Sequence, residues 1–444
     1  TYTHTNFTTG VVSTVTPLPL TLLAGTGGDV LFSANIQYAD SQSGVLSVTQ
    51  NGATLRGIET ARFIFSSSPN NPGDFAVLGG AGWYRHNPHD TLTIGDLTGT
   101  ALTGAITFDG GFGDDVLDAS AAVNVILGAG GVGNDVLLGG SANDVLSGGD
   151  GFDRLSGGSG ANVLDGGAGD DLVEYLGATQ GVRIDLNDGT VANNGHGLSD
   201  TLISIEHLTG GAFNDVLVGN EGGNILTGGL GADVLIGLDG DDVLDGGAGA
   251  ANTLQGGRGD DRYVVSAAGD TLLELAGEGF DTVQTTLSVY RLRDNFEALE
   301  FTGAGAFTGL GNASNNTISG GAGGDTLIGY EGDDILVGGA GAPNTLIGGL
   351  GDDVYVSDAV GDSLIELAGE GYDIVSTTLT TYTLRDNFEE LRFVQAQGVV
   401  ADVVGTGNSQ NNTLGGHRGA DRLAGLAGND TLNGFEGDDT LRGG

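Results

Sequence analysis

The chain has 444 residues, and its net charge of −44 arises from 58 acidic side chains against 14 basic ones. Such an excess of negative charge disfavours anionic partners, so we expect no nucleic-acid binding, and no apolar run is long enough for membrane insertion. Cysteine is absent, which excludes disulfides and thiol chemistry, while glycine, at 87 residues, is far above its usual share of about 7%.

Residues 1–109 are the least regular part of the sequence. Alternating apolar positions at Leu46–Val48 and Ala61–Phe65 predict strands. We expect a β-rich N-terminal region with degenerate repeats that serves as a cap, because an uncovered strand edge at the end of a solenoid invites aggregation.

From residue 110 onward the sequence becomes periodic. Residues 130–174 read as consecutive nine-residue units: GGVGNDVLL, GGSANDVLS, GGDGFDRLS, GGSGANVLD and GGAGDDLVE. Each unit opens with two glycines, carries Asp or Asn at its sixth place, and has Leu or Val at its eighth. Paired glycines allow backbone conformations with positive φ, and a strand places alternate residues on opposite faces. The pattern predicts six residues of turn and three of strand per unit, with two units to a coil and the eighth residue inside.

Units of this kind recur in separate arrays. The sequence therefore predicts an all-β chain, a parallel β-roll or β-solenoid, in four arrays separated by β-rich spacers. The expected segments are the N-terminal region 1–109, array one 110–178, a spacer 179–209, array two 210–265, a spacer 266–310, array three 311–357, a spacer 358–406, and array four 407–444, which stops as a new Gly-Gly pair begins.

A longer repeat covers the C-terminal half. Asp260–Phe301 matches Asp352–Phe393 at an offset of 92 residues, so each copy holds the end of an array and the spacer that follows. We expect the last strand of each spacer to rejoin the solenoid wall. The duplicated pairs Arg293-Asp294 and Arg385-Asp386 are interpreted as structural ion pairs or caps. A further hypothesis makes the spacer glutamates additional calcium ligands: Glu274, Glu278, Glu366 and Glu370.

The sixth-place aspartates are the candidate metal ligands. Each lies at the end of a turn, beside its counterpart one coil along, and stacked carboxylates repel one another unless a cation lies between them. Calcium prefers six to eight oxygen ligands, and aspartate-bearing glycine turns offer both carboxylates and backbone carbonyls. The alternative is that these side chains only form hydrogen-bonded ladders. The candidates are Asp115, Asp135, Asp144, Asp153, Asp171, Asp215, Asp233, Asp242, Asp261, Asp325, Asp334, Asp353, Asp421, Asp430 and Asp439. Places held by asparagine should form weaker sites: Asn162, Asn224, Asn316 and Asn412.

These motifs resemble the repeats-in-toxin (RTX) family of secreted bacterial proteins, also called hemolysin-type calcium-binding repeats. The resemblance implies a parallel β-roll, calcium ions held between turns, and export of an unfolded chain by type I secretion. It also implies an extracellular or cell-surface location. On this interpretation roughly a dozen or more bound Ca²⁺ ions would offset much of the negative charge.

No catalytic signature is found: neither H-E-x-x-H nor G-x-S-x-G occurs in the sequence. We therefore expect a non-enzymatic, calcium-dependent structural protein of a bacterial cell surface, such as a surface-layer, matrix or filament subunit that self-associates. The alternative is that the chain is the C-terminal secretion and folding module of a larger type I-secreted enzyme or adhesin.

Overall fold

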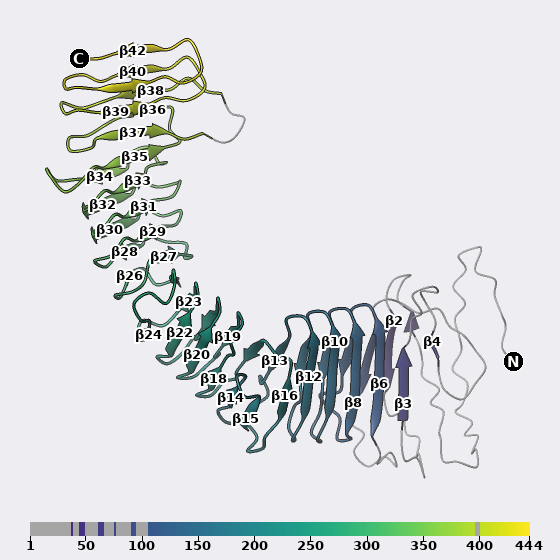
Figure 1. Ribbon diagram of the computed structural model, residues 1–444. Helices are drawn as coiled ribbons and strands as arrows, with labels where there is room; N and C mark the ends of the chain where they lie inside the picture. Colours follow the sequence, from purple (N-terminus) through teal and green to yellow (C-terminus); the bar gives the residue numbers. More distant parts are fainter. Residues whose placement is uncertain are drawn as a thin grey trace, which may run out of the picture. The chain divides into compact units, whose positions relative to one another are not determined.

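The computed structural model describes residues 105–395 and 400–444, together with the backbone of the short strands β1 to β5 (Figure 1). Every regular element of these residues is a β-strand, and almost all neighbouring strands pair in parallel, so the prediction of an all-β parallel solenoid is confirmed. Across the described part of the chain, no helix is present that could cross a bilayer.

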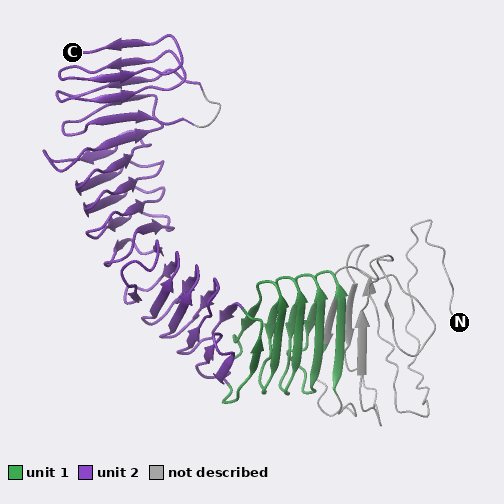
Figure 2. Cartoon of the chain, in the orientation of Figure 1, with its two compact units in different colours: residues 1–177, 196–205 green, residues 178–195, 206–444 purple. Residues whose placement is uncertain are grey.

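The chain divides into two compact units, which Figure 2 distinguishes by colour. Unit 1 consists of residues 1–177 and 196–205, and unit 2 consists of residues 178–195 and 206–444. Within each unit, most successive strands alternate between two sheets, here called the first wall and the second wall.

In unit 1 the walls are built from strands that lie on opposite sides of the coil. The first wall contains β1 (Gln37–Tyr38), β2 (Gly44–Val48), β5 (Asp90–Ile94), β7 (Val116–Asp118), β9 (Val136–Leu138), β11 (Arg154–Ser156) and β13 (Leu172–Glu174). The second wall contains β3 (Ala61–Phe65), β4 (Phe75–Ala76), β6 (Ile106–Phe112), β8 (Ile126–Val132), β10 (Val145–Asp150), β12 (Val163–Ala168) and β16 (Thr201–Ile203).

The N-terminal strands expected from the alternating patterns are confirmed as β2 and β3. Of residues 1–109, the structure describes little beyond strands β1 to β5. The cap expected there therefore lies largely outside the described residues.

In unit 2 the first wall is continuous. It contains β17 (His207–Thr209), β19 (Ile225–Thr227), β21 (Val243–Asp245), β23 (Arg262–Val265), β25 (Thr282–Thr285), β27 (Ala298–Phe301), β29 (Thr317–Ser319), β31 (Ile335–Val337), β33 (Val354–Val356), β35 (Ile374–Thr377), β37 (Glu390–Phe393), β39 (Thr413–Gly415) and β41 (Thr431–Asn433).

The second wall of unit 2 is divided into three segments. The first contains β14 (Arg183–Asp185), β15 (Thr190–Asn193), β18 (Val216–Val218), β20 (Val234–Asp239), β22 (Thr253–Arg258) and β24 (Thr271–Leu273). The next contains β26 (Val289–Arg291), β28 (Thr308–Leu310), β30 (Thr326–Glu331), β32 (Thr345–Leu350) and β34 (Ser363–Ile365). The last contains β36 (Thr381–Thr383), β38 (Val404–Thr406), β40 (Arg422–Ala424) and β42 (Thr440–Arg442).

One coil comprises two repeat units, as predicted. Leu146 pairs with Leu164 in the next coil, and Leu155 pairs with Leu137 in the previous one. These eighth-place leucines are 0% exposed, while their strand neighbours are only partly covered. Each buried leucine contributes roughly 2 kcal/mol of hydrophobic stabilisation, so the leucine columns form the core of a thin solenoid.

The uniform division into six turn residues and three strand residues is wrong for the second wall. There, β10 and β12 run for six residues through the glycine pair, and Gly149 pairs with Gly167. The strands that follow, β13 and β14, each have three residues. Apolar content alone does not mark a strand end when glycine residues continue the ladder.

The duplicated spacers have the same strands at the same offset. In each, the first wall continues through the spacer, from β25 to β27 and from β35 to β37, as expected for a strand that rejoins the wall. The second wall restarts, at β26 and at β36. Arg293 and Arg385 are caps, because each guanidinium donates to two carbonyls of the preceding segment: Asp270 and Leu272, and Asp362 and Leu364.

Candidate metal centres

A hydrogen-bonded ladder joins the sixth-place side chains of successive coils. The backbone N–H of Asp135 donates to Oδ1 of Asp153 at 2.7 Å, and the N–H of Asp153 donates to Oδ1 of Asp171 at 2.8 Å. The same bond joins Asp242 to Asp261 and Asp334 to Asp353. The sequence prediction that these aspartates stack on one another is therefore confirmed, and one carboxylate oxygen of each is used by the ladder.

The second carboxylate oxygen distinguishes two kinds of turn. In one kind, here called open turns, the second and fourth residues both have positive φ. Gly149 and Gly151 have φ values of 125° and 142° in the turn that ends at Asp153. Within residues 105–395 and 400–444, the following open-turn aspartates have a buried Oδ2 without a hydrogen-bond partner: Asp135, Asp153, Asp233, Asp242, Asp261, Asp334, Asp353 and Asp430. A buried charged oxygen without a partner is costly, so each is a candidate metal ligand.

Glycine is required in the open turn because successive turns stack closely. A Cβ on Gly149 would lie 1.9 Å from the carbonyl oxygen of Gly131, and one on Gly167 would lie 2.0 Å from that of Gly149. Backbone carbonyls of one turn therefore face the next turn directly. The turns ending at Asp115 and Asp171 share this backbone conformation, as does that ending at Asp439.

In the other kind, here called capped turns, the N–H of the second residue donates to the sixth-place side chain. Gly140 donates to Oδ2 of Asp144, and Gly211 donates to Oδ2 of Asp215, both at 2.7 Å. Asp325 and Asp421 are bonded in the same way, by Gly321 and His417. Both oxygens of a capped aspartate are therefore used within the protein.

Burial of the open-turn aspartates raises their pKa values. Burial, and then the neighbouring carboxylates of Asp153 and Asp114, raise the pKa of Asp135 to about 7. Burial and the Asp261 carboxylate raise that of Asp242 to about 7, and burial with Asp353 does the same for Asp334. The pKa of capped Asp144 is raised by burial too, but the N–H of Gly140 opposes the shift.

At three of the four asparagine places, the side-chain amide donates a hydrogen bond to a backbone carbonyl. Asn224 uses its side-chain amide to donate to the carbonyl of Glu206 at 2.8 Å, while its Oδ1 caps the turn. Asn316 and Asn412 donate likewise, to the carbonyls of Phe296 and Phe388. These hydrogen bonds support the prediction of weak metal sites at Asn224, Asn316 and Asn412. At Asn162 the amide nitrogen is buried without a hydrogen-bond partner, so the prediction is not supported there.

Two further groups of carboxylates lie where the spacers begin. Asp261, Glu274 and Asp281 each offer a carboxylate oxygen within 4.8 Å of the others, and Asp353, Glu366 and Asp373 repeat the arrangement. Sequence reasoning raised Glu274 and Glu366 as ligands outside the arrays, but Asp281 and Asp373 were missed. Their signal was the short turn motif E-G-F-D and E-G-Y-D before a strand.

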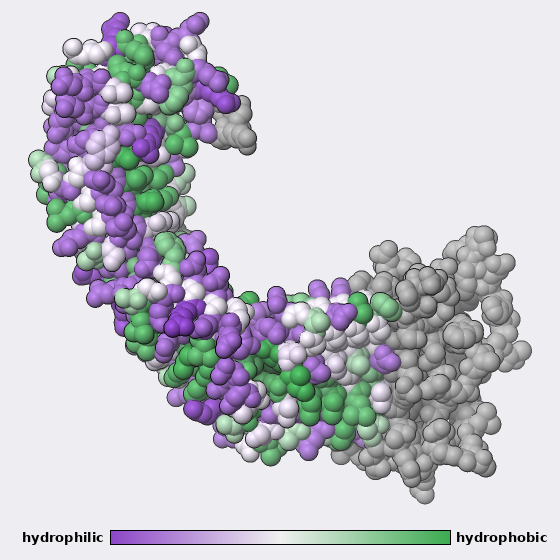
Figure 3. Space-filling view, in the orientation of Figure 1, coloured by the Kyte–Doolittle hydropathy of each residue, from purple (hydrophilic) through white to green (hydrophobic). Residues whose placement is uncertain are grey.

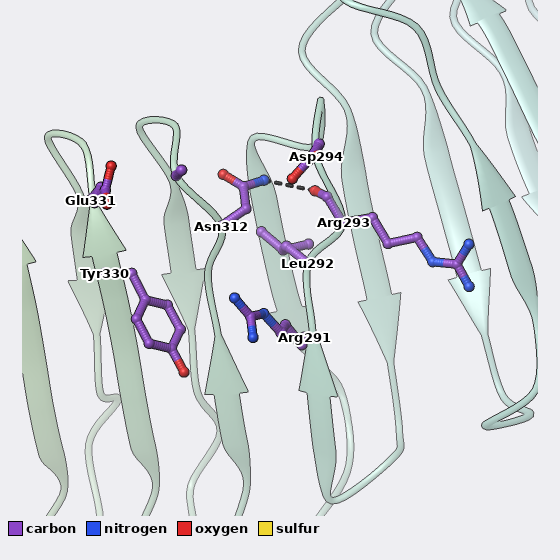
Figure 4. A pocket seen from close by; sticks show the side chains of 8 residues that line it. Arg291, Leu292, Arg293, Asp294, Asn312, Tyr330 and Glu331 are labelled. Carbon is purple, nitrogen blue, oxygen red and sulfur yellow. Dashed lines mark hydrogen bonds between the residues drawn. The ribbon is translucent and has the colours of Figure 1, made fainter.

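A recess of different character lies where the second wall restarts at β26. Figure 4 shows Arg291 beside Tyr330, and its guanidinium lies 5.0 Å from the ring centroid. Arg293 points away from this pair, and Asn312 donates to its carbonyl. The duplicate spacer has Thr383 in place of Arg291, so the recess is not a shared feature of the repeat.

Comparisons with known proteins confirm the resemblance that the nonapeptide units suggested. The model of the RTX calcium-binding nonapeptide repeat matches residues 128–155, 147–175, 204–235, 218–251, 236–272, 310–344 and 415–444. The chain is also similar to two Rhizobium meliloti (strain 1021) proteins. Endo-1,3-1,4-beta-glycanase ExsH is 47% identical over 75 residues, and endo-1,3-1,4-beta-glycanase EglC is 42% identical over 69 residues. The matches cover 17% and 16% of this chain, and 16% and 14% of those proteins.

Proposed function

This chain carries RTX calcium-binding nonapeptide repeats, and from that premise we propose that it is a secreted bacterial module whose folding depends on calcium. The proposed mechanism is mass action. Extracellular calcium modules typically bind at about 10⁻⁴ to 10⁻³ M, far above free calcium in the cytosol. The chain would remain expanded for export and fold outside the cell, because a ligand that binds only the folded state stabilises it.

One observation carries this proposal: the unpaired Oδ2 atoms of the stacked open turns. Asp135 and Asp153 are consecutive in the ladder, and so are Asp242 and Asp261, and Asp334 and Asp353. Carboxylate oxygens and closely stacked backbone carbonyls are the oxygen donors that calcium prefers, so the residues present fit this ion. When bound, calcium supplies the positive charge that these buried carboxylates lack.

The remaining sixth-place aspartates fall into two groups: capped aspartates, which we do not expect to bind calcium, and open-turn aspartates, which we do. Asp144, Asp215, Asp325 and Asp421 use both oxygens within their turns, and their binding to a metal would require those hydrogen bonds to be broken or shared. The open-turn aspartates Asp115, Asp171 and Asp439 complete the set that sequence reasoning selected.

A calcium titration followed by circular dichroism tests the proposal. We expect metal-stripped chain to have little β signal and to gain it cooperatively as calcium approaches millimolar concentration. A β signal that is already complete in chelator, and unchanged by calcium, would contradict the proposal.

For the role of the whole protein, one candidate is a structural subunit of a cell surface that self-associates. Apolar side chains face outward in pairs on the second wall of unit 1: Leu127 and Val145 are partners in the ladder, as are Phe112 and Val132. Each is between 39% and 42% exposed. In Figure 3 apolar surface is visible on this unit among polar side chains. Sedimentation in calcium should then show a lattice or filament that Leu127→Ser and Val145→Ser disperse.

The second candidate is the calcium-folded module of a larger secreted enzyme or adhesin. The two glycanases to which the chain is similar favour it, since the matched stretch is a small part of each of them. The full-length protein would then act on or bind a glycan, and the present residues alone would not. Absence of glycan binding or cleavage by the full-length protein, tested on β-glucans, would remove this candidate.

A further inference from the structure

The three-carboxylate groups at the spacers differ from the array turns in where their ligands come from. Asp261 belongs to the last open turn of an array, while Glu274 follows β24 and Asp281 precedes β25. In the second copy, Asp353, Glu366 and Asp373 have the same places relative to β34 and β35. Two of the three carboxylates therefore come from the spacer.

The spacer turn stacks on the array as if it were another repeat turn. The N–H of Asp261 donates to Oδ1 of Asp281 at 3.0 Å, and the N–H of Phe280 donates to Oδ1 of Asp260 at 2.8 Å. A Cβ on Gly279 would lie 1.8 Å from the carbonyl oxygen of Gly259, the same close approach that array glycines make. The ladder thus continues from the array into the spacer without interruption.

A tyrosine holds the glutamate in this position. Tyr263 and Tyr355 occupy the eighth place, where most units have leucine, and both are 0% exposed. The hydroxyl of Tyr263 accepts from the N–H of Gly256 and donates to a carboxylate oxygen of Glu274. Tyr355 makes the same two contacts, with Gly348 and Glu366. The tyrosine therefore fixes one oxygen of each glutamate. The other oxygen, Oε1, has no hydrogen-bond partner in Glu366, and in Glu274 it accepts from the N–H of Leu275 at 3.2 Å.

Unpaired oxygens are left in both groups. In the second copy, Oδ2 of Asp353, Oδ2 of Asp373 and Oε1 of Glu366 have no hydrogen-bond partner, and the three residues are 0%, 1% and 7% exposed. In the first copy Oδ2 of Asp261 is unpaired, in a residue that is 1% exposed. Carboxylates this deeply buried and this close need a positive charge or protons between them.

The carboxylate oxygens of each group lie within 4.8 Å of one another, so their negative charges repel. A divalent cation bound between the three carboxylates would offset this repulsion.

We propose that each group, Asp261–Glu274–Asp281 and Asp353–Glu366–Asp373, is a divalent-cation site, selective for a hard ion such as Ca²⁺, that fastens the spacer to the array before it. Three carboxylates give a donor set of higher charge than two stacked aspartates. The inference rests on the proposed function, because it assumes a chain that folds around calcium. It adds ligands from outside the nonapeptide and one ion for each of the two duplicated spacers.

The test is a count of bound calcium by equilibrium dialysis with metal analysis. Compared with the wild-type chain, the double variant Glu274→Gln and Glu366→Gln should bind two fewer ions, one for each spacer. Glu221→Gln with Glu331→Gln is the matched control, since it removes two exposed carboxylates from the same solenoid and should lose none. An unchanged count in a folded Glu274→Gln/Glu366→Gln variant would overturn the inference.

A second measurement keeps the inference testable if that variant does not fold. Terbium, which replaces calcium in oxygen sites, emits on excitation through a nearby tyrosine. Wild-type chain loaded with terbium should show this emission, and Tyr263→Phe with Tyr355→Phe should remove most of it. Tyr290→Phe with Tyr382→Phe is the control, because these tyrosines, on β26 and β36, belong neither to an open turn nor to a three-carboxylate group. Emission that persists in the first variant, or falls equally in the control, would contradict the proposed location.

The two proposals can fail separately. A chain that folds fully without calcium refutes the proposed function and the site together. A chain that folds with calcium, binds it in the arrays, and keeps its ion count in the glutamate variant refutes only the spacer sites.

Discussion

Two turns that follow one another in the sequence, residues 139–144 and 148–153, have opposite chemistry. The first is GGSAND and the second is GGDGFD. In the first, Gly140 donates to Asp144, and both oxygens of the carboxylate are satisfied. In the second, positive φ at Gly149 and Gly151 turns the amides away, and Oδ2 of Asp153 is left unpaired. The same aspartate at the same place is thus a structural cap in one turn and a proposed metal ligand in the next.

The comparison shows that the same aspartate at the sixth place has different hydrogen-bond partners in the two kinds of turn, and under the proposed function only the open turn binds metal. The fourth residue has a strong influence, because Ala142 and Phe213 occupy capped turns and a side chain disfavours the positive φ of an open turn. Glycine at this place is necessary but not sufficient, since Gly323 and Gly419 lie in capped turns.

Acid should have the largest effect on the metal-free chain, because many open-turn carboxyl groups act together. Their folded-state pKa values, about 7 for Asp135 and about 6 for Asp153, are above the ordinary value of 3.8. The stability from protonating them is complete below about pH 3.8 and is lost as the pH rises through about 6 to 7. Circular dichroism in chelator should therefore show β structure increasing from about pH 8 to about pH 5.

In the presence of calcium, acid is expected to destabilise the folded chain instead, because protons compete with the metal for the same oxygens. The apparent calcium affinity should decrease as the pH falls through the same range. A metal-free chain that loses β structure on mild acidification would contradict the assignment of these raised pKa values.

The next largest effect on stability is expected when a glycine in an open turn is substituted. Gly149→Ala places a Cβ against a backbone carbonyl at positive φ, and should lower the free energy of unfolding in saturating calcium by about 3 kcal/mol. Gly177→Ala is the control, because nothing lies within 4 Å of a Cβ there. Denaturant titration measures both, and an equal loss in the two variants would mean that close stacking of turns is not the cause.

Substitution of the sixth-place aspartate should have different effects on calcium binding and stability in the two turns. Asp153→Asn removes a proposed ligand, so it should reduce the number of bound ions and cost about 2 to 3 kcal/mol in excess calcium. Asp144→Asn loses one hydrogen bond acceptor in a capped turn, costs about 1 kcal/mol, and leaves the ion count unchanged. Calorimetric calcium titration gives the counts. Loss of ions in Asp144→Asn but not in Asp153→Asn would reverse the comparison.

The smallest effect is expected from charges on the walls. Arg262 and Glu300 form an ion pair at 3.3 Å with both side chains almost half exposed. Glu300→Gln should change the free energy of unfolding by no more than about 0.5 kcal/mol, since solvent screens such pairs. Thermal melting in calcium measures it. A loss as large as that of Asp153→Asn would show that net charge matters more than the position of the carboxylate.

The fold could be predicted from the sequence because a nine-residue repeat is compatible with few architectures. Leu137, Leu146 and Leu155 were expected inside, and all are 0% exposed. The stacking of sixth-place residues also followed from the period, and the ladder bonds confirm it. Both features depend only on the position of each residue within the nine-residue unit.

The division of turns could not be read from the pattern. Whether Gly140 donates to Asp144, or an amide turns away as in the next unit, depends on the φ of the second and fourth residues of the turn. Leu238 and Tyr330 adopt positive φ at the second place although they are not glycine. The carboxylate groups at the spacers needed the stacking of a turn, Glu274–Asp281, that lacks the glycine pair. The available signals were the tyrosine at the eighth place and the motif E-G-F-D or E-G-Y-D before the next strand.

The most direct test is anomalous X-ray diffraction from calcium-containing crystals of this chain, which locates each ion without reference to any prediction. The account predicts ions beside the unpaired oxygens of open turns, including Asp135, Asp153, Asp242 and Asp334, and none at the capped Asp144 and Asp215. Ions at the capped aspartates with none at the open turns would contradict it.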